Sequence, residues 1–375
     1  MTTHEPILSQ PIIDRNTAAG AAIYVNGRFR VHSATGLQRY AEELLGRIHG
    51  RVSGRLDVVQ PGRKLTGLAG HAWEQFILPS RTRGLLWSPC NTGPVAVRRQ
   101  IVTIHDLFPL DHPEWFAPNF VRCYRAVVPR LMRRVQRLIA VSEYTKSRMV
   151  AAVPEAESKI TVIHSGIGKQ FHPQSLRAIQ QAAHETALPS RKYVLSVSSV
   201  EPRKNVARIL QAWQRALPHL PHDLWLVMAG KQGKASVFGS GEFGPLPERV
   251  RFTGYVPDNV LPGLYAGAQA FLFPSLAEGF GFPPLEAMAC GVPVLTSDTS
   301  SLIEVCGGAA SLVDPLDVDA IAKGLVTLVR DGSLRRGLRE RGLARARQFS
   351  WDTTARTTAN LIENEIHSRE RRPLR

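Results

Sequence analysis

The chain contains 375 residues, 43% of them hydrophobic, and carries a formal net charge of +16 at pH 7. This length is large for one hydrophobic core and therefore favours two domains. The sequence holds no run of about 18 apolar residues, which excludes a transmembrane helix.

The first residues and the cysteines bear on where the protein works. Residues 1–20 lack the basic start and apolar block of a signal peptide, and we expect a disordered extension there. The cysteines are widely spaced and form no metal-binding pattern, and they fit a reducing, cytoplasmic location. They are Cys90, Cys123, Cys290 and Cys306.

Short apolar strands alternate with helical segments through the N-terminal half. The predicted strands are 22–25, 85–88, 101–104, 138–142 and 160–164. Helical periodicity covers 38–49 and 119–137.

The segment 119–137 is the most basic part of the chain, and Pro129 could break it into two helices. One face is apolar and the other basic. Such a surface attracts anionic lipid headgroups or nucleic acid, although a solvated helix face gives the same pattern. No nucleic-acid-binding signature is present, so we expect no nucleic-acid partner. The basic residues are Arg122, Arg125, Arg130, Arg133, Arg134 and Arg137.

After a polar region at about 170–190 without a clear strand, the alternation restarts. Strands are predicted at 193–200, 224–229, 250–255, 270–273, 293–296 and 310–313, and helices at 205–216, 259–267, 284–290, 317–330, 333–348 and 352–367. Two such alternations predict two doubly wound α/β domains, at 21–175 and 190–350, followed by a C-terminal helix and basic tail at 351–375. Ligands of these sheets bind beyond the carboxyl ends of the strands, so we expect the site in the cleft between the domains.

The most informative stretch is Glu278-Gly-Phe-Gly-Phe-Pro-Pro-Leu-Glu286, directly after the strand at 270–273. The two prolines fit the first turn of a helix, whose N-terminus favours a phosphate. Gly279 and Gly281 allow the backbone to approach a ligand. Glu278 and Glu286 can each accept hydrogen bonds from a pair of hydroxyls. A tight turn followed by a glutamate that complements the helix dipole is the structural alternative.

Basic residues follow two strands of the C-terminal half. Arg203 and Lys204 come after the strand at 193–200, just before a helix, and together can neutralise a diphosphate. An ordinary basic surface loop is the alternative. Lys231 follows the next strand and gives a weaker signal.

The N-terminal half offers two candidates. His105 follows the strand at 101–104 and could bind a sugar hydroxyl or a phosphate, or shuttle a proton, with Asp106 orienting its ring. Gly36 enters the first helix and could let the backbone approach a phosphate. A structural His-Asp pair and a bare glycine turn are the alternatives.

Several other chemistries are excluded or disfavoured. Asp317-Val-Asp319 resembles the metal-binding Asp-x-Asp of some sugar transferases, but its place at a helix start indicates helix capping. No Gly-x-Ser-x-Gly elbow and no Walker A loop are present. We therefore expect no metal and no cofactor.

The chain resembles the retaining GT-B glycosyltransferases of family 4 from about residue 22 to 367. The stretch from Pro274 to Val294 is similar to the family's E-x7-E signature. The segments 35–40 and 104–106 resemble those of bacterial mannosyltransferase-like members. Further matching pieces are Glu201-Pro-Arg-Lys-Asn205, Phe252-Thr-Gly-Tyr-Val256, Leu264-Tyr-Ala-Gly-Ala268, Val141-Ser-Glu-Tyr144 and Phe349-Ser-Trp351.

The resemblance implies a fold and a set of roles. The fold is GT-B, with two Rossmann-like domains facing across a cleft and a C-terminal helix crossing back to the N-terminal domain. Glu278 would hold the donor sugar and Glu286 the ribose, while Arg203 and Lys204 would bind the diphosphate. Backbone N–H groups of Phe280, Gly281 and Phe282, next to Gly279, would support the sugar and phosphates, Gly254 and Val256 would lie near the base, His105 near the sugar and Gly36 near the diphosphate. Many members have Gly-Arg where this chain has Ser198-Ser199, which places more of the diphosphate contact on Arg203.

The implied reaction is metal-independent transfer of a hexose, foremost mannose from GDP-mannose, with retention at the anomeric carbon. A UDP-hexose donor and a non-catalytic polyanion- or membrane-binding protein with a degenerate GT-B fold are the alternatives. The expected acceptor is a saccharide, free or linked to polyprenyl diphosphate, in surface polysaccharide biosynthesis such as that of lipopolysaccharide. We expect a cytoplasmic protein with peripheral contact to the anionic inner face of the plasma membrane.

Overall fold

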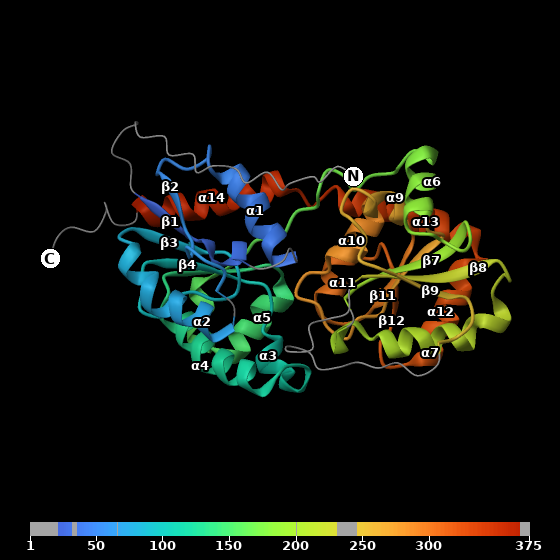
Figure 1. The fold of residues 1–375 in the computed structure, drawn as a ribbon, viewed down its shortest axis with the longest axis horizontal. Helices are drawn as coiled ribbons and strands as arrows, with labels where there is room; N and C mark the ends of the chain where they lie inside the picture. The colour runs from blue at the N-terminus through green and yellow to red at the C-terminus, as the bar shows by residue number, and fades with distance from the viewer. Residues whose placement is uncertain (1–21, 32–35, 66, 200, 231–245, 368–375) are drawn as a thin grey trace.

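The computed structural model describes residues 22–31, 36–65, 67–199, 201–230 and 246–367. The predicted extension at 1–20, Lys231 and the basic tail beyond residue 367 lie outside the described residues. The chain forms two α/β units, each built on a six-stranded parallel sheet (Figure 1). The prediction of two doubly wound domains is confirmed.

The N-terminal sheet has the strand order β2-β1-β3-β4-β5-β6. Figure 1 shows α1 and α14 above β1, β3 and β4, and α2, α3, α4 and α5 below these strands. The strands are β1 (Ile23–Asn26), β2 (Leu56–Val59), β3 (Leu85–Ser88), β4 (Gln100–Ile104), β5 (Arg137–Ala140) and β6 (Ile160–Val162). The helices are α1 (Gly36–Ile48), α2 (Gly67–Ala72), α3 (Phe108–Asp111), α4 (Pro118–Arg134) and α5 (Glu143–Ala152). Short helical turns are η1 (Gly27–Val31), η2 (Trp73–Ile77), η3 (Pro79–Arg81), η4 (Pro113–Trp115) and η5 (Pro154–Lys159).

The C-terminal sheet has the order β12-β11-β10-β7-β8-β9. Its strands are β7 (Lys192–Val197), β8 (Leu224–Ala229), β9 (Val250–Gly254), β10 (Ala270–Phe273), β11 (Val294–Ser297) and β12 (Ser311–Val313), and the helices of this half are α6 (Leu176–Glu185), α7 (Val206–Ala216), α9 (Leu261–Ala266), α10 (Phe282–Ala289), α11 (Ser300–Cys306), α12 (Val318–Arg330) and α13 (Gly332–Ala346), with turns η6 (Pro202–Lys204) and η7 (Leu217–His219). The central strands β10 and β11 are buried along their whole length, as expected of parallel strands covered by helices on both faces.

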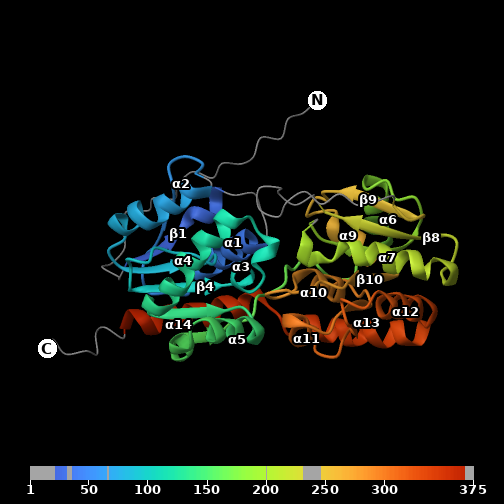
Figure 2. The same cartoon turned by 90° about the horizontal axis from the view of Figure 1, so that it is seen from below.

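The C-terminal helix α14 (Trp351–His367) returns to the N-terminal domain, as predicted. Figures 1 and 2 both place it along that domain, away from the C-terminal sheet. Ion pairs hold it there: Asp352 contacts Arg51 at 3.4 Å, and Glu365 contacts Arg137 at 2.5 Å. These ion pairs therefore fix the last described helix to the N-terminal domain.

Some elements differ from the predictions. The helix α4 runs unbroken through Pro129, and the polar region at 170–190 contains the helix α6. The strand β2 and the helices α2, α3, α5 and α11 were not predicted. Asp317 caps α12 by accepting hydrogen bonds from the N–H groups of Asp319 and Ala320, both at 2.9 Å, which confirms its predicted capping role.

The two domains touch through backbone at Gly279. A Cβ atom on this glycine would lie 2.0 Å from the carbonyl oxygen of His105 in the other domain. The Oγ of Ser142, at the start of α5, donates to the Gly279 carbonyl at 2.7 Å. Glu304 on α11 adds a second contact, because its carboxylate accepts from the first N–H groups of α5, at 2.9 Å from Glu143.

This packing predicts that Gly279→Ala destabilises the protein. The methyl group has no space against His105, so we expect a loss of about 1–3 kcal/mol in the free energy of unfolding, measured by denaturant titration.

Gly46→Ala is the matched control. Gly46 lies on α1, and a Cβ atom there meets nothing within 4 Å. This substitution should leave stability unchanged or raise it by up to about 1 kcal/mol. Equal stability of both variants would contradict the close packing at Gly279.

Candidate active site

The candidate site lies at the point in the C-terminal sheet where the order of strands along the chain reverses. The strand β7 pairs with β8 on one side and with β10 on the other, so chain order reverses between β7 and β10. Loops that leave two such strands diverge and open a crevice for ligands. Arg203 and Lys204 follow β7, and Glu278 follows β10, so topology brings these residues together.

Buried hydrogen bonds fix the two loops to each other. Asn205 has a left-handed backbone, and its side-chain amide donates to the carbonyls of Pro274 at 2.9 Å and Pro315 at 2.7 Å. The carbonyl of Arg203 accepts from Leu276 N at 2.8 Å and lies 2.9 Å from Ser275 Oγ. These bonds place the turn η6 against the loop after β10.

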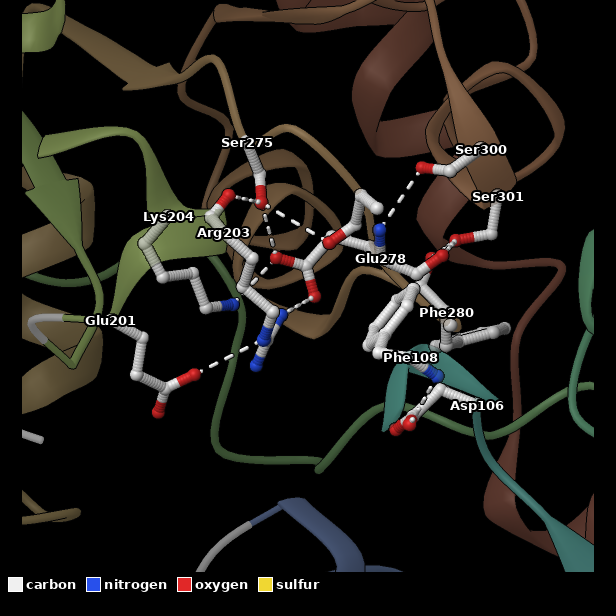
Figure 3. Close-up of polar contacts among 12 residues, drawn as sticks. Asp106, Phe108, Glu201, Arg203, Lys204, Ser275, Glu278, Phe280, Ser300 and Ser301 are labelled. Carbon is white, nitrogen blue, oxygen red and sulfur yellow. Dashed lines mark hydrogen bonds and ion pairs between the residues drawn. The ribbon is translucent and has the colours of Figure 1, made fainter. Parts of the chain in front are cut away.

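Glu278 lies at the centre of this arrangement (Figure 3). Its carboxylate accepts from Arg203 Nη1 at 2.7 Å, from Lys204 Nζ at 2.6 Å and from Ser275 Oγ at 2.7 Å. Its backbone N–H donates to Ser300 Oγ at 3.0 Å. The side chains of Glu278 and Lys204 are 8% and 7% exposed, so this is a buried, charge-assisted network.

The electrostatics of the network are nearly balanced. Burial opposes the charge on Glu278, but Arg203 and Lys204 outweigh it and lower the pKa of this carboxyl to about 2. Burial and the nearby Arg203 lower the pKa of Lys204. Glu201 contacts Arg203 Nε at 3.0 Å and accepts from the hydroxyl of Ser199. The cations Arg203 and Lys204 thus pair with the carboxylates Glu201 and Glu278. An anion that binds to these cations would compete with the carboxylates.

The N-terminal domain contributes Asp106 and Phe108 to the same place. The guanidinium of Arg203 lies 5.7 Å from the centre of the Phe108 ring. Burial raises the pKa of Asp106 to about 6, against the opposing effect of Arg203. This carboxyl therefore changes charge next to the cations within the physiological pH range.

Glu286 belongs to a second polar cluster that also joins the domains. It accepts from Tyr265 Oη at 2.9 Å and from Arg39 Nη1 at 2.9 Å. Arg39 belongs to α1 and also contacts Asp258 at 3.1 Å. Burial raises the pKa of Glu286, although Arg39 opposes this. The carboxylate predicted to hold a ribose is thus bound by an arginine from the other domain.

The start of α10 offers fewer donors than the sequence pattern implied. Gly281 precedes the helix with φ +103°, a left-handed conformation that favours glycine. Of the first three helical residues, Phe282 alone carries an N–H, because the next two are prolines. Phe280 is buried against Phe349, and a Cβ on Gly36 would lie 3.5 Å from the Phe282 ring. The starts of α1 and α10 therefore face each other. Most of the positive charge at the candidate site comes from the side chains of Arg203 and Lys204 and not from these helix ends.

His105 is buried, and its ring contacts a carbonyl. Its Nε2 lies 2.8 Å from the Pro89 carbonyl, and the ring meets Tyr40 edge-on at 4.7 Å. Burial lowers the pKa of His105 to about 4, so the ring is neutral at pH 7. The interpretation that Asp106 orients this ring was wrong, because Asp106 accepts from Phe108 N at 3.4 Å and Pro89 accepts from the ring.

The predicted base-side residues lie at the end of β9. Gly254 has φ +71° and open space around its Cβ position, whereas Val256 is buried. The Gly254 carbonyl accepts from Gly230 N at 2.8 Å, which ties the ends of β8 and β9 together. These residues lie at and just beyond the carboxyl end of β9 and join neither polar cluster.

Comparison with known proteins identifies the family. The family described as "Glycosyl transferases group 1" matches residues 180–345, and "Glycosyltransferase Family 4" matches residues 82–170. O-antigen chain mannosyltransferase B of Escherichia coli is 33% identical over 269 residues, which make up 71% of this chain and 71% of that protein. The chain belongs to glycosyltransferase family 4. It is therefore a glycosyltransferase, as predicted.

Other relatives and solved structures agree with this assignment. The glycosyltransferase is 31% identical over 265 residues to serotype-specific mannosyltransferase WbdA of Escherichia coli, covering 68% of this chain but 32% of WbdA. The structure of WaaG, a glycosyltransferase of lipopolysaccharide biosynthesis, superposes with a TM-score of 0.68 at 16% identity, over 91% of this chain and 99% of WaaG. The structure of Anabaena HepE with UDP and glucose gives 0.69 at 17% identity, over 92% of this chain and 100% of HepE. The predicted GT-B fold is confirmed.

Sequence reasoning did not assign roles to several residues of the glycosyltransferase site. Arg39, Asp258 and Tyr265 surround Glu286, and Ser275 binds Glu278. Arg39 belongs to the segment 35–40, which resembles the family. A charged residue about one helical turn after Gly36 was the sequence signal that could have indicated its role. Its partner in the other domain was not visible in the sequence.

The raised pKa of Asp106 predicts a pH dependence of donor binding. As the pH rises from 5 to 7, Asp106 gains a negative charge near Arg203, so affinity for a nucleotide sugar should fall by about fivefold, or ~1 kcal/mol. Titration calorimetry at successive pH values measures this change.

Asp106→Asn is the isosteric control. The variant should match the wild type at pH 5 and keep that affinity at pH 7, because its side chain stays neutral. A wild-type affinity that does not vary with pH, or a variant that varies in parallel with it, would show that Asp106 does not control this step.

Proposed function

We propose that this glycosyltransferase moves mannose from GDP-mannose to a saccharide acceptor, with retention at the anomeric carbon, in surface polysaccharide biosynthesis. The observation that carries the proposal is the network of Glu278, Arg203 and Lys204 at the switch point of the C-terminal sheet. Two relatives named as O-antigen chain mannosyltransferases, from Escherichia coli and Salmonella typhimurium, support the sugar and the pathway.

Donor binding exchanges partners within the two clusters. The diphosphate attracts Arg203 and Lys204, which releases the Glu278 carboxylate to accept hydrogen bonds from hydroxyls of the donor sugar. The ribose hydroxyls replace Arg39 on Glu286. The cations are already in place and partly desolvated, so little reorganisation is needed when the charge develops.

Transfer then changes two bonds at the anomeric carbon. The bond from this carbon to the phosphate oxygen breaks, and a bond to the acceptor oxygen forms on the same face. The leaving phosphate takes the acceptor proton. Arg203 and Lys204 stabilise the charge on the nucleoside diphosphate, so the proposal needs no metal ion, no cofactor and no enzymic nucleophile.

The acceptor binds on the N-terminal domain in this proposal, as a saccharide that is free or carried on polyprenyl diphosphate. A lipid-linked acceptor requires the protein to work at the membrane surface. Among the described helices none has the length and hydropathy to cross a bilayer. For a lipid-linked acceptor we propose peripheral attachment to the cytoplasmic face of the plasma membrane.

A nucleotide panel tests the donor. GDP and GDP-mannose should raise the melting temperature, because a ligand that binds only the folded state stabilises it, whereas UDP and UDP-hexoses should have a smaller effect. Stabilisation by UDP-sugars alone would indicate that the donor is a UDP-hexose and not GDP-mannose. No stabilisation by either set would favour a non-catalytic protein with the same fold.

Substitution of Glu278 separates sugar contact from diphosphate contact. Glu278→Gln removes the negative charge with which Arg203 and Lys204 are paired. Both cations are then more available to a diphosphate, so affinity for the nucleoside diphosphate should hold or rise. Transfer should fall by about a hundredfold or more, because the carboxylate that holds the sugar is lost. Calorimetry and product analysis measure the two effects.

Glu340→Gln, at an exposed position on α13, is the matched control and should change neither quantity. Circular dichroism confirms that the Glu278→Gln variant is folded, since disturbing a buried ion pair can destabilise a protein by ~3–5 kcal/mol. Undiminished transfer by this variant would remove Glu278 from the donor site.

A further inference from the structure

The helix formed by α2 and η2 presents an apolar face outward. It runs from Gly67 to Ile77. Every side of it that is open to solvent carries apolar residues or glycine, and three large side chains are 72%, 78% and 43% exposed. These three are Leu68, Phe76 and Ile77, and the other exposed positions are Gly67, Ala69 and Ala72.

The polar side chains of the same helix point into the protein. Glu74 is 1% exposed and accepts from Asn26 Nδ2 at 2.7 Å, Arg28 Nη1 at 2.8 Å and Thr92 Oγ1 at 3.1 Å. Gln75 donates to the Gly93 carbonyl at 2.9 Å. A surface helix of a water-soluble domain normally has the opposite arrangement, so this face is built to meet something other than water.

The inner contacts fix where this helix lies. Asn26 ends β1, and its amide also contacts Ser88, the last residue of β3, at 3.3 Å. Chain order in the N-terminal sheet reverses between β1 and β3. The helix is therefore anchored at the carboxyl ends of these strands, the edge where such domains bind ligands.

Positive charge surrounds the apolar face. Glu74 is the only acidic residue from 58 to 105, and it is buried. Four exposed basic residues flank the helix, two on each side, and Arg98 is exposed farther along the chain. The flanking residues are Arg63, Lys64, Arg81 and Arg83.

The basic helix α4 covers the same face of the sheet as α2 (Figure 1). Its large apolar residues face the core, with Val128 and Leu131 fully buried, and none of them is exposed. The exposed arginines of α4 thus extend the positive surface around α2 and η2. Of these two helical segments, only the one formed by α2 and η2 combines flanking charge with large exposed apolar side chains. The membrane contact expected at α4 is better supported at this neighbouring helix.

We propose that the outer face of α2 and η2 docks on an anionic lipid bilayer. Leu68, Phe76 and Ile77 enter between the headgroups, and Arg63, Lys64, Arg81 and Arg83 contact lipid phosphates. The proposal rests on the proposed function, since it identifies the surface that brings the acceptor-binding edge to a membrane-borne acceptor. The charge selects an anionic membrane over a neutral one.

Vesicle sedimentation with the full chain tests the proposal. Wild-type protein should bind vesicles of phosphatidylcholine with about 30% phosphatidylglycerol at least tenfold more tightly than pure phosphatidylcholine, since each basic residue at the surface adds about a factor of five. Leu68→Ser with Phe76→Ser should lower partitioning to the anionic vesicles by about tenfold or more.

Leu176→Ser is the matched control, because Leu176 on α6 is 77% exposed and lies in the other domain. It should bind vesicles like the wild type. All variants should keep the wild-type thermal stabilisation by nucleotide, which separates failure of docking from failure of the proposed function. Three outcomes would overturn the proposal. The double variant could bind vesicles as well as the wild type does, or the wild type could show no preference for anionic lipid. The third is self-association of the wild type that the double variant loses.

Discussion

The ion pairs of Glu278 with Arg203 and Lys204 are the interaction on which the rest of the site depends. They join the loops after β7 and β10, the two strands between which the C-terminal sheet reverses. Burial makes them strong, and it also means that neither cation is free until an anion arrives. These three side chains therefore organise the site, and in the proposed reaction Arg203 and Lys204 supply positive charge to the leaving diphosphate.

The contacts between the domains involve the same segment that is proposed to bind the donor. Gly279 touches the His105 carbonyl, next to Glu278, and Glu286 is held by Arg39 from α1. A donor that releases Arg39 from Glu286 also removes one link between the domains. In the proposed mode of donor binding, the donor and the relative position of the domains are thus coupled through two residues of the E-x7-E motif.

The sequence predicted most of the features that depend on local order along the chain, although it missed β2, α2, α3, α5 and α11. Glu278, Arg203 and Lys204 each follow a clear strand, and the topology of a parallel sheet brings such positions together. The pair of Arg39 and Glu286 is separated by 247 residues, and no local pattern reveals it. The helix of α2 and η2 was missed because its polar residues face inward, toward Asn26, Arg28 and Thr92, so its pattern resembles no ordinary surface helix.

The central claim is that Arg203 and Lys204 pass from Glu278 to the donor diphosphate. A crystal structure of the complex with an intact, non-transferable nucleotide sugar tests it most directly. The account predicts that both cations lie within hydrogen-bond distance of diphosphate oxygens and that Glu278 accepts from hydroxyls of the sugar. A bound donor with the contact between Lys204 and Glu278 intact, and with its diphosphate held elsewhere, would contradict it.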